Sequence, residues 1–147
     1  GLFTSEEESV NVEVAITHKG EGQVAGVGVI ATDNRGQEKA TWAMRERSMG
    51  HFLLDYAEAV KIAMVKVRSQ NWSAVKFGIT DQQLLRQLGS GRSKDIRLYA
   101  QVEEINSLRS MFRQCSFYLL QDEQRLRSRH ISLYATCILF DEERLVP

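Results

Sequence analysis

Basic side chains gather in two places along this sequence, and they are the residues best suited to hold a charged ligand. The first cluster comprises Arg86, Arg92, Lys94 and Arg97, and the second comprises Arg109, Arg113, Arg125, Arg127 and Arg129. The planar guanidinium of arginine can donate two parallel hydrogen bonds to a phosphate. The clusters are therefore suited to phosphate binding. The interpretation that the sequence favours slightly is a solvated surface balanced by nearby acids, which are Glu103, Glu104, Asp122 and Glu123.

Other reactive side chains form no recognisable site. His18, His51 and His130 lie far apart and lack the spacing of zinc ligands. The glycines at positions 26 and 28 precede an expected hairpin turn rather than a helix, which excludes a dinucleotide-binding motif. No serine or cysteine has the context of an activated nucleophile, so covalent catalysis is not indicated.

The overall charge argues against strong non-specific binding to nucleic acid. The chain of 147 residues has 19 Lys plus Arg and 19 Asp plus Glu, hence a formal net charge of zero. A basic overall field is typical of nucleic-acid binders, so any such binding must come from a local basic face. A chain of this length buries roughly 70% of its unfolded surface, enough for one self-sufficient domain.

Cysteine usage and apolar runs indicate a compartment. Cys115 and Cys137 lie in apolar segments, which favours buried thiols in a reducing environment, cytoplasmic or nuclear. No apolar run reaches the length of about 20 residues that a membrane span needs. The sequence begins at Gly1 without the pattern of a signal peptide, which predicts a trimmed segment of a longer protein.

Hydrophobic periodicity gives the elements that must position these residues. Alternating apolar residues predict strands over 10–18, 23–33 and 38–47, and a helical stripe predicts a helix over 51–69. Further along, the patterns predict a strand over 74–80, helices over 82–88 and 95–112, and a strand over 115–120. They also predict a last helix that begins at Asp122 or Ser128. Its expected buried residues are Ile131, Tyr134, Cys137 and Ile138. We expect an acidic segment over 1–9, one domain over 10–141 and a tail over 142–147.

Four motifs in this order resemble those of the ribonuclease H-like family. They are AGVGVIATDNRG at 25–36, YAEAV at 56–60, VKFGITDQQLL at 75–85 and DEQRLRSRHI at 122–131. The resemblance covers roughly residues 10–140 and is greatest to the plant-type branch, whose domains also occur in retroelement proteins. It implies an α/β fold with a mixed five-stranded sheet, in which a three-strand antiparallel meander is followed by two crossover strands, with helices on both faces.

Active members of this family hold two magnesium ions with four carboxylates. By resemblance, Glu58 and Asp81 fall on two of these metal ligands. The first acid maps near Ala15, where there is no carboxylate, and Glu13 lies two positions earlier. The last acid maps to Arg129 or His130, where a cation opposes metal binding. If the chain has no metal site, Glu58 is a surface residue paired with Lys61, and Asp81 is a helix N-cap.

The sequence therefore predicts a degenerate, non-catalytic ribonuclease H-like domain that acts as a binding module and needs no cofactor. Its partner would be another protein, another domain of a longer chain, or RNA or an RNA–DNA hybrid bound through Arg86, Arg92, Lys94, Arg97 and Arg129. The alternative is an active, magnesium-dependent ribonuclease H that cuts the RNA of such hybrids with Glu13, Glu58 and Asp81.

Overall fold

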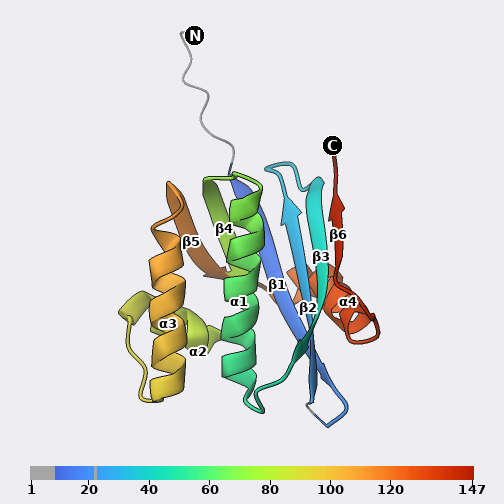
Figure 1. The fold of residues 1–147 in the computed structure, drawn as a ribbon. Helices are drawn as coiled ribbons and strands as arrows, with labels where there is room; N and C mark the ends of the chain where they lie inside the picture. Colours follow the sequence, from blue (N-terminus) through green and yellow to red (C-terminus); the bar gives the residue numbers. More distant parts are fainter. Residues whose placement is uncertain (1–8, 22) are drawn as a thin grey trace.

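The computed structural model describes residues 9–21 and 23–147 (Figure 1). The elements are, in chain order, β1 Val10–Lys19, β2 Val24–Thr32, β3 Glu38–Arg47, α1 Phe52–Ser69, β4 Ala74–Ile79, α2 Gln82–Ser90, α3 Ile96–Arg109, β5 Gln114–Leu119, the 3-10 turn Asp122–Gln124, α4 Leu126–Ala135 and β6 Glu142–Leu145. The expected acidic segment over 1–9 lies outside the described residues except for Ser9. Among the described residues, no helix has both the length and the apolar character to cross a membrane.

One mixed sheet organises the fold, and the predicted α/β class is confirmed. The strand order is β5-β4-β1-β2-β3-β6. The pairs β1–β2, β2–β3 and β3–β6 are antiparallel, whereas the pairs β1–β4 and β4–β5 are parallel. The parallel strands require crossover connections, which α1 and the α2–α3 pair supply.

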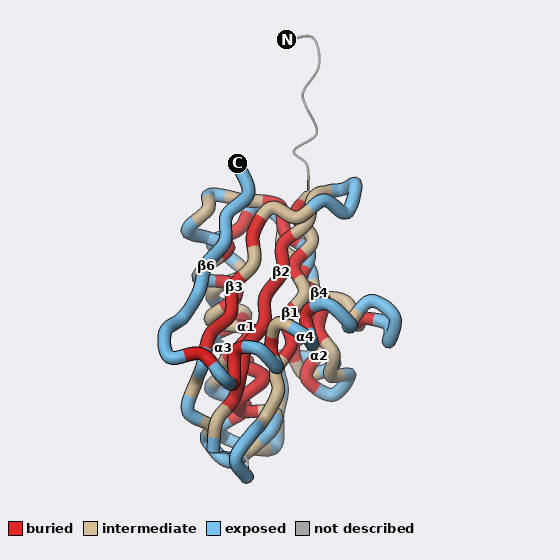
Figure 2. Tube along the Cα trace, turned by 90° about the vertical axis from the view of Figure 1, so that its right-hand side faces the viewer, coloured by how far each residue is buried: buried red, intermediate tan, exposed pale blue. Residues whose placement is uncertain are grey.

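The sheet has six strands, not the predicted five. The sixth, β6, lies in the stretch that the sequence leaves as a tail, and all its residues are exposed (Figure 2). Its charged sequence has no apolar alternation, so no period-2 signal exists. Contacts with β3 hold it instead, because the indole Nε1 of Trp42 donates to Glu143 at 2.7 Å.

The main core lies between the sheet and helices α1 and α3, which run side by side on one face (Figure 1). The strict alternation in β1 places Val10, Val12 and Val14 on this face. Tyr56 and Val60 of α1 pack against them and are also fully buried. The predicted first strand and long helix are therefore confirmed.

Helix α4 covers the opposite face of the sheet with small residues. Ser128, Ser132 and Ala135 are its buried positions. They lie against the glycines of β2 so closely that a Cβ atom on Gly26 would stand 2.1 Å from the carbonyl oxygen of Ser132. The glycines of this strand thus permit close packing between helix and sheet.

The predicted buried face of the last helix is wrong in part. The helix ends at Ala135, so Cys137 and Ile138 follow it rather than belong to it. Ile138 is buried, but Tyr134 and Cys137 are exposed, and only Cys115 of the two cysteines is partly buried. Apolar periodicity could not find the buried face, because small polar residues occupy it.

Candidate functional site

The hydroxyl of Tyr56 forms hydrogen bonds with both chain segments at the point where strands β1 and β4 separate. Parallel pairing of these strands runs from Val10–Val75 to Glu13–Gly78. Just beyond it, the Tyr56 hydroxyl donates to the carbonyl of Val14 at 2.5 Å and accepts from the backbone N–H of Thr80 at 2.8 Å. Burial raises the pKa of this hydroxyl far above its ordinary value, so it stays neutral and bridges the two strands.

A fixed cation lies close to this bridge. The Nε and Nη2 atoms of Arg125 donate to the carbonyl of Leu120 at 2.9 and 2.7 Å. The charge of Arg125 lowers the pKa of the Tyr56 hydroxyl, whereas the charge of Asp81 raises it, so both side chains act on the bridge. The sequence had suggested Arg129 or His130 as the opposing cation, but both are exposed on α4. The cation that faces inward is Arg125.

Asp81 and Glu58 both have structural partners in this arrangement. Asp81 caps α2, since its Oδ1 accepts from the backbone N–H of Leu84 at 2.8 Å. Glu58 is 40% exposed, pairs with Lys61 at 2.9 Å and accepts from Gln101 of α3 at 3.4 Å. These contacts are those of a helix cap and of a surface residue between two helices.

Glu13 lies on the other face of the sheet. Its side chain forms a hydrogen bond with Ser128 of α4, whereas its neighbour Val14 faces α1. Burial raises the pKa of the Glu13 carboxyl, although the Ser128 hydrogen bond partly opposes this rise.

A magnesium site does not fit these residues. Among residues 9–21 and 23–147, no three His, Cys, Asp or Glu side chains lie close enough to share a metal ion. Mg²⁺ takes oxygen ligands that converge at short distances, yet Glu13 and Glu58 lie on opposite sides of the sheet. The position near the expected first acid, Ala15, is buried and offers no side-chain oxygen.

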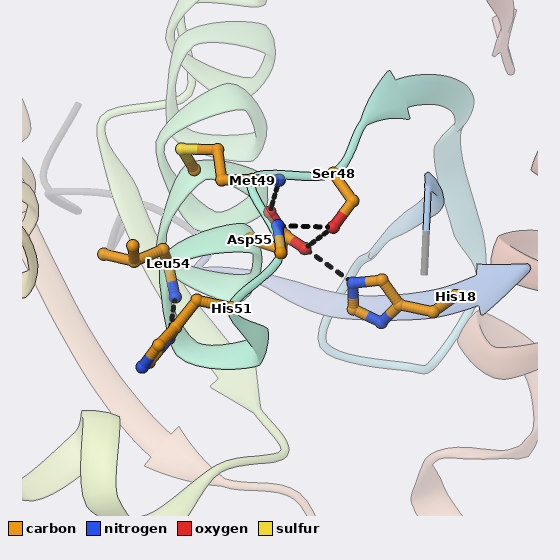
Figure 3. Close-up of polar contacts among 7 residues, drawn as sticks. His18, Ser48, Met49, His51, Leu54 and Asp55 are labelled. Atoms are coloured by element: carbon orange, nitrogen blue, oxygen red, sulfur yellow. Dashed lines mark hydrogen bonds and ion pairs between the residues drawn. The ribbon is translucent and has the colours of Figure 1, made fainter. Parts of the chain in front are cut away.

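A buried carboxylate that the sequence did not single out organises the start of α1 (Figure 3). Asp55 is only 5% exposed and accepts from three groups: the Nε2 of His18 at 2.6 Å, the hydroxyl of Ser48 at 2.5 Å and the N–H of Met49 at 2.8 Å. Burial alone would raise the pKa of Asp55, but hydrogen bonds from Met49, Ser48 and His18 outweigh it and lower the pKa. We call these four residues the Asp55 network.

The Asp55 network fixes the loop that leads into α1 and, with it, His51. His51 caps α1 because its Nδ1 accepts from the N–H of Leu54 at 3.3 Å (Figure 3). In the neutral ring the proton is therefore on Nε2, which leaves that nitrogen as a donor. The sequence did not reveal this network, because His18 lies on β1 and the loop residues Ser48 and Met49 carry no recognisable motif.

A cavity of about 770 Å³ opens where α1, α2 and α3 meet. Its lining residues are His51, Leu53, Gln83, Gln87, Arg92, Ser93, Lys94, Asp95, Leu98 and Tyr99. Two members of the first predicted basic cluster, Arg92 and Lys94, thus lie on its walls. A concave surface with an apolar floor and a few polar groups is the usual form of a ligand site.

The structure separates the predicted basic residues into free and paired ones. Within the described part of the chain, Arg86, Arg92 and Lys94 are exposed and take part in no ion pair. Arg97 pairs with Asp95 at 3.3 Å. In the second cluster Arg125 points inward and Arg127 pairs with Glu38. Arg129 lies on α4, across the sheet from the cavity.

Comparison with known proteins matches both the sequence and the fold. A family model described as reverse transcriptase-like matches residues 11–126. No curated protein matches the chain. Among solved structures, ribonuclease H1 from the archaeon Halobacterium salinarum is 15% identical, with a TM-score of 0.74, over 86% of this chain and 98% of that one.

Two further matches were solved with nucleic acid. LC11-RNase H1, isolated from a compost metagenome and bound to an RNA/DNA hybrid, is 16% identical with a TM-score of 0.70, over 80% of this chain and 89% of that one. The foamy viral protease-reverse transcriptase with dsDNA is 10% identical with a TM-score of 0.63, over 89% of this chain and 92% of that one. At such identities the likeness concerns the fold.

Proposed function

Because the chain belongs to the reverse transcriptase-like family and has the ribonuclease H-like fold, we propose that it is a non-catalytic module that binds nucleic acid. The observation that carries the binding role is a set of free cations: Arg92 and Lys94 line an open cavity, and Arg86 is exposed on α2, which forms one wall of it. The bridge made by Tyr56 supports the absence of catalysis.

The chemistry of phosphodiester cleavage in this family needs two metal ions between converging carboxylates. Here the neutral hydroxyl of Tyr56 joins β1 to the end of β4, and the guanidinium of Arg125 lies nearby. A fixed positive charge repels a divalent cation. Asp81 is left as the only one of the predicted acids near this point, because Glu13 faces α4 and Glu58 faces α3.

Binding through the basic side chains is consistent with a net charge of zero. Phosphate contacts depend on the electrostatic potential near each cation rather than on the net charge of the chain. Arg97 and Arg127 add less to this potential, because each is paired with an acid. The relatives solved with an RNA/DNA hybrid and with dsDNA support nucleic acid as the partner of this fold. Each cation that contacts a phosphate steepens the slope of the logarithm of the binding constant against the logarithm of the salt concentration by about one.

A salt titration of binding tests this proposal. We expect a labelled single-stranded RNA or an RNA–DNA hybrid to bind at low salt, with an affinity that falls steeply as salt is added. The double variant Arg92→Gln/Lys94→Gln should lower the affinity at least tenfold and reduce the slope by about two. The control is Arg129→Gln, which removes one positive charge on the opposite face and should change binding little. An absence of binding at low salt would refute the proposal.

Protein docking is a second candidate, and one specific observation favours it. Leu139 and Phe140, which follow α4, are 84% and 82% exposed. Adjacent exposed apolar side chains of this size are typical of protein–protein contact sites. If the chain binds no nucleic acid at low salt, docking through this pair becomes the leading function, and Leu139→Ser/Phe140→Ser is the variant that should abolish it.

A further inference from the structure

The cavity between α1, α2 and α3 combines apolar and polar lining residues, as a pocket for a partly polar group does. Leu53 and Leu98 give it apolar surface, and the volume of about 770 Å³ lies within the usual range for small-ligand pockets, roughly 300–1,000 Å³. A paired duplex presents its phosphates outward and keeps its bases stacked inside. A cavity with this lining is therefore open only to a base that is not paired.

The polar groups on its walls match the edge of a nucleobase. Gln83 and Gln87 of α2 line the cavity, and the Oε1 of Gln87 is shielded from solvent without a hydrogen-bond partner among the described residues. A buried acceptor without a partner is uncommon in folded proteins. The Gln87 amide, after rotation about its last side-chain bond, and the Nε2 donor of His51 together offer both a donor and an acceptor.

An aromatic ring and two cations also line the cavity. Tyr99 is 39% exposed, lines the cavity, and donates its hydroxyl to Glu103 at 3.0 Å, which restrains the ring. Arg92 and Lys94 provide positive charge on the same walls. The carboxylate of Asp95 also lines the cavity, but Arg97 neutralises it and its Oδ1 caps α3.

We propose that this cavity receives one unpaired base of a nucleic-acid strand, while Arg92 and Lys94 hold the flanking phosphates. The inference rests on the proposed function and makes it more specific, since a single strand, or one with an unpaired base, should bind more tightly than a fully paired duplex. Aromatic rings bind bases of any sequence through their faces, so little sequence preference is expected. Free mononucleotides share this chemistry and should compete only weakly, because they lack the second phosphate contact.

The decisive experiment compares two strands on the unchanged protein. One is a short single-stranded oligonucleotide, and the other is an abasic strand with the same number of phosphates. We expect the strand with bases to bind about tenfold more tightly. A blunt duplex should bind like the abasic strand, and a mononucleotide should compete only at millimolar concentration. Equal binding of the two strands would overturn the base pocket and leave the phosphate-binding proposal standing, whereas binding of neither strand would remove both.

Variants of the ring give an independent readout. Tyr99→Leu should weaken the strand with bases about tenfold and leave the abasic strand unchanged, because only the stacking surface is lost. Tyr99→Phe keeps the ring and should restore binding of the strand with bases. Loss of affinity for both strands in Tyr99→Leu would instead indicate damage to the local fold and would contradict the assignment of this ring to the base.

Discussion

Tyr56 and Thr80 are joined by a hydrogen bond of 2.8 Å from the backbone N–H of Thr80 to the tyrosine hydroxyl, and the same hydroxyl donates to the carbonyl of Val14. One neutral oxygen thus satisfies two backbone groups where β1 and β4 part. Had this position held a carboxylate, it could not have donated to the carbonyl of Val14. The bridge therefore depends on a neutral hydroxyl that can donate and accept at the same time.

Removing this hydroxyl should cost stability. Tyr56→Phe leaves the N–H of Thr80 and the carbonyl of Val14 without their partner in a buried position. We expect the free energy of unfolding to fall by about 2 kcal/mol, as measured by urea denaturation. The control is Tyr134→Phe, because its hydroxyl contacts Glu142 at the surface, and a change below about 0.5 kcal/mol is expected there. Equal effects of the two variants would contradict the bridge.

The Asp55 network should make stability depend on pH in the acid range. The pKa of Asp55 is lowered in the folded protein, so the ionised carboxylate stabilises the fold above the unfolded value of about 3.9. This stabilisation is lost as the pH falls through the lower, folded pKa. Asp55→Asn should therefore lower the free energy of unfolding by about 2 kcal/mol at pH 7, and by much less at pH 2.

The control for this prediction is Asp122→Asn, since the side chain of Asp122 is 93% exposed and forms only a long contact with Arg125. Its effect should be below about 0.5 kcal/mol at any pH. Denaturant unfolding of the three proteins at several pH values makes the comparison. The prediction would be contradicted if the difference in the free energy of unfolding between the original chain and Asp55→Asn grew as the pH fell.

Close packing of α4 on β2 predicts opposite effects of two glycine substitutions. Gly26→Ala would place a Cβ atom 2.1 Å from the carbonyl oxygen of Ser132, so the helix must move, and we expect a loss of about 3 kcal/mol. Gly89→Ala, in α2, meets nothing within 4 Å and should raise stability by up to about 1 kcal/mol. Thermal unfolding of both variants measures the contrast.

Much of the fold could be predicted because its signals are local. The alternation in β1 and the capping position of Asp81 are readable from neighbouring residues, and both have the expected structure. The strand β6 and the buried face of α4 could not be predicted, because charged residues in one and small polar residues in the other carry no apolar period.

The candidate site was less predictable for a different reason. The resemblance to the ribonuclease H-like family indicated which acids should meet, but the direction of each side chain depends on contacts made across the sheet. Glu13 meets Ser128 of α4, and Arg125 turns inward to the carbonyl of Leu120. Of the partners of Asp55, His18 comes from β1 and is brought close only by the fold, whereas Ser48 lies in the loop just before α1.

The measurement that tests the central claim most directly is the length of a labelled RNA strand in an RNA–DNA hybrid after incubation with saturating protein and Mg²⁺ or Mn²⁺. Because no group of acids among residues 9–21 and 23–147 converges to hold a metal ion, we predict that the RNA remains full length while the hybrid is bound. RNA cleavage that disappears in the Asp81→Asn variant would contradict the account.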